Sequence, residues 1–150
     1  MTPRQIEVVR SSFAQVEPIA DVAATIFYGR LFTLDPALRA LFPADLTAQR
    51  RNLMQTLAVV VRGLDRLDVI GPAVGALGER HAGYGVKTED FETVGCALLD
   101  TLAERLGAAF TPETRAAWTA AYGLLAGVMQ TAGAHAAQSA PATRPAVAAA

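Results

Sequence analysis

Ile70–Val86 reads IGPAVGALGERHAGYGV, and this stretch decides how the rest of the chain is interpreted. One helical face of it carries residues at spacings of four, three and four: Ile70, Val74, Leu77 and His81. An imidazole at the end of an apolar helical face has two interpretations. It is either a core histidine that is hydrogen-bonded to the backbone or a ligand to a metal. The rest of the chain is needed to decide between them.

Apolar residues at three- and four-residue intervals recur along most of the remaining sequence, with capping residues between the runs. Thr2-Pro3, Asp35-Pro36 and Thr111-Pro112 each combine a polar cap with a proline suited to a first helical turn, whereas Pro18 interrupts a helix. The predicted helices cover residues 2–17, 19–33, 35–42, 46–64, 70–81, 88–106 and 111–133. No segment alternates as a strand does, so the predicted class is all-α, with six long helices plus a short one.

The composition describes one globular domain. Of the 150 residues 52% are hydrophobic and 18% are charged, and the net charge is −1, which argues against nucleic acid or an anionic membrane as the main partner. The first residues, MTPRQIEVVR, lack an apolar signal core, and no apolar run reaches transmembrane length, so we expect a cytoplasmic protein. The end of the chain is rich in Ala, Pro, Ser and Thr. We therefore predict a folded domain over residues 1–133 and a disordered tail over residues 134–150.

Side-chain chemistry narrows the function. Cys96 is the only cysteine, which excludes an internal disulfide or a multi-cysteine zinc site, and its apolar surroundings predict a buried thiol. The patterns G-x-S-x-G, H-E-x-x-H, C-x-x-C and the phosphate-binding loop are all absent. What remains is an inward-facing His81, with Tyr28, Gln49 and several aromatic residues on other helices. One axial nitrogen ligand, apolar walls and a few polar donors opposite it suit a haem pocket.

Several short segments also stand in an order and at separations known from one family. They are Ile26-Phe27-Tyr28, Leu31-Phe32, Asp35-Pro36, Leu41-Phe42, Gln49, Leu53, Glu79-Arg80-His81, Tyr84-Gly85-Val86, Val94-Gly95, Trp118 and Tyr122. Taken together, they resemble the globins, and more closely the single-domain bacterial globins akin to the haem domain of flavohaemoglobins. The resemblance spans residues 2 to about 132 and implies a globin fold that encloses a haem pocket.

The resemblance implies a role for each matching residue. His81 is the expected proximal ligand of the iron of haem b, while Tyr28 and Gln49 are expected to hydrogen-bond a bound O₂. The remaining expected cofactor contacts are Phe42 on the haem face, Leu53 beside the distal pair, Arg80 and Tyr84 at the haem edge, and Val86 and Phe91. Expected partners are O₂, NO and CO, with an external reductase as a further candidate.

Two departures from the flavohaemoglobin pattern concern the proximal side. Phe91 stands where those haem domains carry a tyrosine, and near Gly133 there is no acid where they carry a glutamate. The resemblance therefore implies less anionic character at His81 and a weaker push toward O–O chemistry. The sequence also ends without a flavin or NAD domain, so an NO dioxygenase with a built-in reductase is not expected.

Three functions remain open at this point. The first is reversible, tight O₂ binding for storage, transport or scavenging, and it rests on Tyr28, Gln49 and His81 together. The second is enzymatic conversion of NO to nitrate with electrons from a separate reductase. The third is a haem-free or sensor domain on the same helical scaffold.

Overall fold

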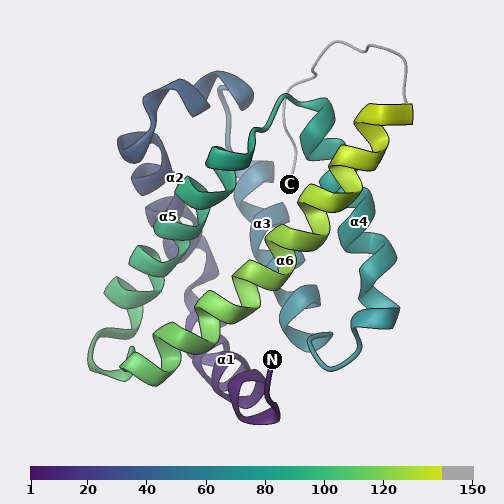
Figure 1. The fold of residues 1–150 in the computed structure, drawn as a ribbon. Helices are drawn as coiled ribbons and strands as arrows, with labels where there is room; N and C mark the ends of the chain where they lie inside the picture. Colours follow the sequence, from purple (N-terminus) through teal and green to yellow (C-terminus); the bar gives the residue numbers. More distant parts are fainter. Residues whose placement is uncertain (140–150) are drawn as a thin grey trace.

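The computed structural model describes residues 1–139, and within them all regular structure is helical (Figure 1). The six α-helices are α1 (Pro3–Val16), α2 (Ala20–Leu34), α3 (Thr47–Arg62), α4 (Leu67–Gly83), α5 (Thr88–Leu106) and α6 (Pro112–Ser139). Three 3₁₀ segments connect them: Glu17–Ile19, Pro36–Leu41 and Gly107–Ala109. The predicted all-α class with six long helices is confirmed, and the predicted short helix is the 3₁₀ segment Pro36–Leu41.

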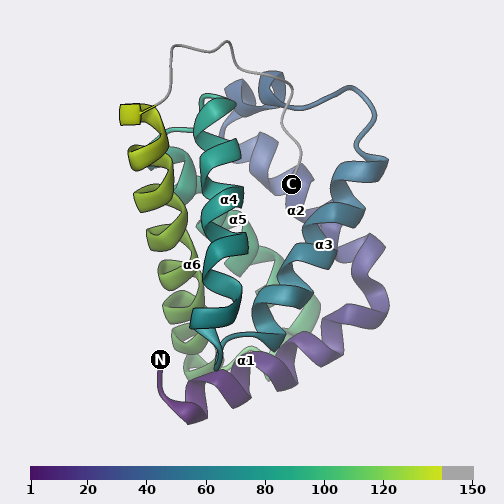
Figure 2. The same cartoon turned by 90° about the vertical axis from the view of Figure 1, so that its right-hand side faces the viewer.

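The helices surround a common interior, and the long helix α6 passes along one side of it (Figure 1). In Figure 1, α6 runs diagonally across the front, with α5 on one side of it and α4 on the other. The perpendicular view shows α4 and α6 side by side, and α1 lying across their lower ends (Figure 2). A Cβ atom at Gly78 would collide with the backbone of Met129, so glycine permits this close approach of α4 to α6.

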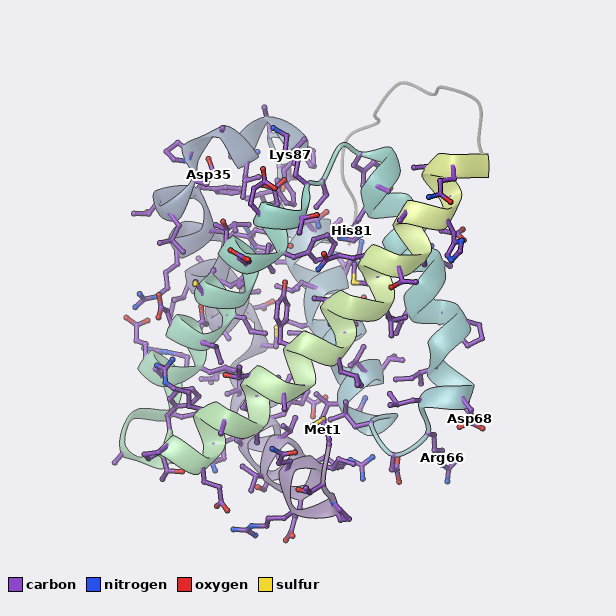
Figure 3. The ribbon with its side chains drawn as sticks, in the orientation of Figure 1. Met1, Asp35, Arg66, Asp68, His81 and Lys87 are labelled. Carbon is purple, nitrogen blue, oxygen red and sulfur yellow. The ribbon has the colours of Figure 1, made fainter. Side chains whose placement is uncertain are left out.

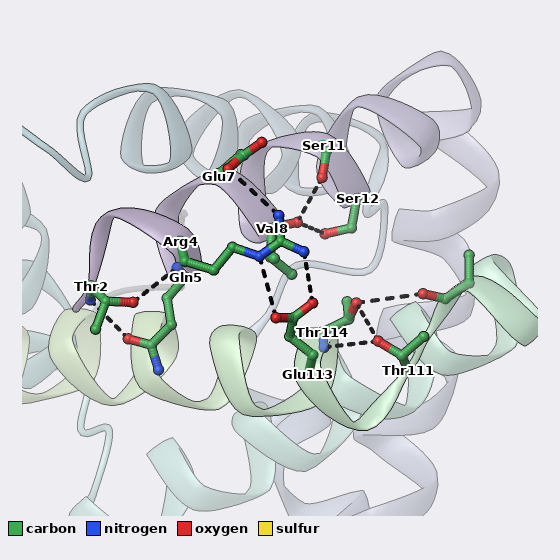
Figure 4. A network of polar contacts seen from close by, with 11 residues as sticks. Thr2, Arg4, Gln5, Glu7, Val8, Ser11, Ser12, Thr111, Glu113 and Thr114 are labelled. Carbon is green, nitrogen blue, oxygen red and sulfur yellow. Dashed lines mark hydrogen bonds and ion pairs between the residues drawn. The ribbon is translucent and has the colours of Figure 1, made fainter.

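Polar contacts tie the start of α1 to the start of α6 (Figure 4). The Thr2 hydroxyl accepts a hydrogen bond from the backbone N–H of Gln5 (3.1 Å), and the Gln5 side chain accepts one from the N–H of Thr2 (3.0 Å). This reciprocal pair is a capping box, and it confirms the predicted helix start. In the first turn of α1, Arg4 pairs with Glu113 at 3.0 Å, which links the two helix starts.

The core between α1 and α6 centres on Trp118. Its Nε1 donates to the buried hydroxyl of Ser12 at 2.8 Å, and its ring centroid lies 6.2 Å from that of Phe13. The polar end of the indole is thereby satisfied while its ring fills the core, as buried tryptophans require. This contact anchors the first helix to the last.

Helix α4 differs at its start from the prediction over residues 70–81. It begins at Leu67 and continues through Pro72, although proline cannot donate to the carbonyl one turn earlier. It ends at Gly83, two residues beyond the predicted end. Tyr84 caps it, and Gly85 follows with φ +86°. That left-handed backbone suits glycine, and it turns the chain directly after the helical turn that carries His81.

Two further predictions need correction. Cys96 is exposed rather than buried, because it lies two residues from both Val94 and Leu98 and so faces away from their side of α5. The boundary predicted at residue 133 lies inside α6, which continues to Ser139, because alanine readily extends a helix that has already formed. The rest of the predicted tail, residues 140–150, lies outside the described residues. No helix in the described part of the chain is long and apolar enough to cross a membrane.

Candidate functional site

The interior holds an apolar cavity of about 120 Å³ that opens in part to solvent. It lies between α3, α4, α5 and α6, and Phe27 of α2 adds to its wall. The other residues that line it are Leu53, Thr56, Leu57, Leu77, His81, Val86, Asp90, Phe91, Val94, Leu98, Tyr122, Leu125, Ala126 and Met129. Four predicted cofactor contacts, Leu53, His81, Val86 and Phe91, therefore meet in one cavity.

His81 projects into the interior from the last turn of α4 (Figure 3). Its Nδ1 lies 2.8 Å from the carbonyl oxygen of Leu77, and within residues 1–139 this is the only hydrogen bond of the ring. Because a carbonyl can only accept, the neutral ring carries its proton on Nδ1 and leaves a lone pair on Nε2. Burial lowers the pKa of His81, which keeps the imidazole neutral at pH 7. The side chain is thus prepared to ligate a metal through Nε2.

Tyr28 and Gln49 lie together beside the cavity rather than on its wall. They are only 4% and 6% exposed, and their side chains hydrogen-bond each other. Burial raises the pKa of Tyr28 to about 12. The hydrogen bond with Gln49 and the charge of Arg50 lower this pKa, but by less than burial raises it. The Tyr28 ring packs edge-on against Phe27, a wall residue, at a centroid distance of 5.0 Å. The phenol is therefore protonated at neutral pH and can donate a hydrogen bond.

The remaining predicted contacts occupy three different places. Phe42 packs edge-on against the Tyr28 ring at 5.6 Å and is not part of the cavity wall. The ring of Tyr84 lies 6.2 Å from that of His81. Arg80 is exposed and lines a separate groove between α3 and α4, which shares Thr56 and Leu77 with the cavity. Arg80 thus stands at a neighbouring opening rather than inside the cavity.

Besides Thr56, two polar wall residues, Tyr122 and Asp90, were not predicted as site residues. The Tyr122 hydroxyl donates to the backbone carbonyl of Phe91 at 2.6 Å, and burial raises its pKa. Asp90 is 8% exposed and accepts from the backbone N–H of Lys87 at 2.8 Å. In the sequence Tyr122 contributes to the family resemblance without a role of its own, and Asp90 is only a favourable charge near a helix start. A signal for either role would have required knowing which helices face each other.

The donor set of the cavity fits haem better than a bare metal ion. Within the described residues no group of three or more His, Cys, Asp or Glu side chains could hold a metal ion. A single neutral imidazole in an apolar cavity instead suits a metal that arrives with its other ligands, as iron does in haem. The lone pair on Nε2 of His81 could hold the iron of such a group.

Comparisons with known sequences agree with this geometry. The sequence profile of the family described as Globin matches residues 25–129. The chain is 30% identical over 133 residues to a flavohemoprotein of Vibrio cholerae and 32% identical over 132 residues to one of Deinococcus radiodurans. These alignments cover 85% and 86% of this chain but 33% of each relative. The chain therefore spans about a third of the length of these curated relatives.

Solved structures show the same arrangement of helices. An engineered carbene transferase from Rhodothermus marinus, described as a candidate nitric oxide dioxygenase, superposes with a TM-score of 0.83 at 25% identity, over 92% of this chain and 96% of that one. A bacterial globin from Campylobacter jejuni superposes with a TM-score of 0.81 at 20% identity, over 91% and 99% of the two chains. At 20% identity, the similarity to the Campylobacter jejuni globin shows a shared fold and nothing more.

Proposed function

The chain belongs to the globin family, and on that premise we propose that it is a haem b protein that binds O₂ reversibly and tightly, for storage, transport or scavenging. Haem, when bound, supplies the iron at which diatomic ligands coordinate reversibly. Within the family we propose a particular likeness to single-domain bacterial globins such as the methanotroph protein known as Hell's Gate globin I. NO and CO are expected to compete for the same position.

The proposal assigns one task to each side of the cavity. On the proximal side Nε2 of His81 would hold the iron, while the Nδ1–H bonds to the Leu77 carbonyl and fixes the direction of the imidazole ring. On the distal side the Tyr28 hydroxyl donates to the bound ligand, and Gln49 holds that hydroxyl in place. The raised pKa keeps the donated proton on the Tyr28 oxygen at neutral pH.

The edge of the haem has its own candidate contact. Arg80 lines an exposed groove between α3 and α4 that shares two wall residues with the cavity. We assign its guanidinium to a haem propionate, since a carboxylate matches its forked donors. Phe42, Tyr84 and the apolar wall residues would hold the ring system by contact.

The observation that carries the proposal is that Nε2 of His81 makes no hydrogen bond within the described residues and that His81 lines an apolar cavity. Ultraviolet–visible spectra of the ferric, ferrous and O₂-exposed protein test it. We expect a Soret band that changes with oxidation state and O₂, and its loss or strong weakening in His81→Ala. His135→Ala, at the only other histidine and outside the cavity wall, is the matched control. A protein that takes up no haem when supplied with it would contradict the proposal and favour a haem-free function.

A second candidate is an NO dioxygenase that draws electrons from a separate reductase. Its support is the similarity to flavohemoproteins and to the candidate nitric oxide dioxygenase. Against it, Phe91 offers no hydroxyl to the proximal side, and position 133 carries no acid. A Cβ at Gly133 would lie 3.1 Å from the Cβ of Ala82, so a side chain there would require its neighbours to shift. Repeated NO turnover with an added electron donor would favour this candidate, whereas a single turnover per haem would favour O₂ binding.

A further inference from the structure

Arg39, at the end of the 3₁₀ segment Pro36–Leu41, bonds three consecutive backbone carbonyls. Its Nη1 donates to the carbonyls of Phe42 (3.3 Å) and Pro43 (2.8 Å), and its Nη2 donates to that of Ala44 (2.9 Å). These carbonyls belong to the loop that leads into α3, where no regular helix or strand engages them. One guanidinium therefore performs the bonding that secondary structure performs elsewhere.

The same side chain contacts a cluster of three aromatic rings, which we call the ring triangle: Tyr28, Phe32 and Phe42. The centroid distances are 5.4 Å between Phe32 and Phe42, 5.6 Å between Tyr28 and Phe42, and 6.0 Å between Tyr28 and Phe32. The guanidinium of Arg39 lies over the Phe32 ring, 5.3 Å from its centroid. Arg39 thus hydrogen-bonds the backbone carbonyl of Phe42 and also stacks on Phe32, one member of the ring triangle.

We propose that Arg39 is a positioning residue that fixes the Tyr28 hydroxyl for ligand binding by clamping the loop at residues 42–44 and the ring triangle. This inference deepens the proposed function and rests on it, since it concerns the ligand side of the same site. The clamp depends on the planar fork of arginine. A lysine ammonium keeps the charge and most of the stem, but it cannot bond three carbonyls while stacking on a ring.

The chain contains a matched control in Arg10 of α1. Its Nε donates to the carbonyl of Val61 (3.1 Å), and its Nη2 donates to the carbonyl of Arg62 (2.8 Å) and to Asp65 (2.7 Å). Arg10 therefore clamps the end of α3 in the same chemical manner, but it has no contact with the ring triangle. Arg10→Lys removes a comparable clamp at a place where the inference predicts no effect on the ligand.

The test compares Arg39→Lys with Arg10→Lys by infrared spectroscopy of the CO complexes. A donor aimed at the CO oxygen lowers the C–O stretching frequency. We expect the band of Arg39→Lys to broaden and shift to higher wavenumber, and that of Arg10→Lys to match wild type. Phe32→Leu, which removes the ring beneath the guanidinium, should shift the band in the same direction. Unshifted bands in Arg39→Lys and Phe32→Leu, or an equal shift in Arg10→Lys, would overturn the inference.

Amide hydrogen exchange of the protein as purified separates this inference from the proposed function. The N–H groups of Phe42 and Thr47 are bonded within the loop, to the Arg39 carbonyl and the Asp45 side chain. We expect Arg39→Lys to speed their exchange at least tenfold, and Arg10→Lys to leave it unchanged. If wild type forms no CO complex, the proposed function fails. Unchanged exchange in Arg39→Lys would then overturn the clamp itself.

Discussion

The Tyr28 hydroxyl combines burial, one side-chain partner and a raised pKa in a single group. If it donates to bound O₂, Tyr28→Phe removes a hydrogen bond to a partly charged acceptor, which contributes about 1.5–3 kcal/mol. We therefore expect O₂ to dissociate about 10- to 100-fold faster, as measured by stopped-flow displacement with CO. Thr33→Val, which removes an exposed hydroxyl on the same helix and outside the cavity wall, is the control. An unchanged rate in Tyr28→Phe would remove this tyrosine from the distal role.

The same hydroxyl predicts a dependence of stability on alkaline pH. The native pKa of Tyr28 is about 12, against 10.0 for an ordinary tyrosine, so the native state holds this proton more tightly than the unfolded state does. The stabilisation is complete below pH 10 and is lost as the pH rises through 12, at a total cost of about 3 kcal/mol. Urea unfolding between pH 9 and about 12 should therefore show a smaller loss of stability in Tyr28→Phe than in wild type. Parallel pH profiles would contradict the burial of an un-ionised phenol.

The placement of residues, as distinct from their roles, was predictable from the sequence where a local pattern indicated it. The face that ends in His81 could be read from spacing alone, and the resemblance pointed to Tyr28 and Gln49. The exposure of Cys96 was also readable in principle, since the apolar face defined by Val94 and Leu98 excludes it. Tyr122 could not be assigned, because its bond to the Phe91 carbonyl joins residues 31 positions apart.

At the level of elements, the crossing of α4 and α6 is the most constrained contact of the fold. Gly78→Ala would place a methyl group against the Met129 backbone, which cannot move aside as a flexible side chain can. We expect a loss of about 1–3 kcal/mol in urea unfolding, together with weaker haem retention because α4 carries His81. Gly75→Ala is the control on the same helix, since its Cβ would make only an ordinary 3.7 Å contact with Ala132. It should be neutral or stabilise by up to about 1 kcal/mol. Equal effects would contradict the close approach.

Helix boundaries followed from the sequence wherever a cap marks them. The starts at Pro3 and Pro112 lie where a cap and a proline predicted them. Helix α5 begins at the predicted Thr88. The start of α4 and the end of α6 were missed, because no local cap marks either one. Leu67 begins a helix that tolerates Pro72, and the alanine-rich run beyond residue 133 extends α6 rather than breaking it.

For the molecule as a whole, the sequence indicated a haem pocket but not the cavity that forms it. Its wall draws on five helices and the loop that contains Val86, and residues such as Asp90, Leu98 and Met129 reach it only through the packing of α5 and α6. Apolar spacing identifies the buried side of each helix, yet it does not say which buried sides meet at a cavity and which meet in solid packing. Only the three-dimensional arrangement separates the two.

A cavity shared by so many helices predicts that haem and folding stability are linked. Binding to the native state alone stabilises it by about 1.4 kcal/mol for each tenfold rise of free haem above the dissociation constant. For a chain of this size that corresponds to an increase of about 3–6 °C in the unfolding midpoint. Thermal unfolding at graded haem concentrations should show this slope in wild type. His81→Ala should shift the whole curve toward higher haem concentration, because the apolar wall remains while the iron ligand is lost. If the unfolding midpoint of wild type does not change with haem concentration, the folded cavity does not bind haem. Any haem spectrum would then come from haem bound to unfolded protein or adhering to the surface.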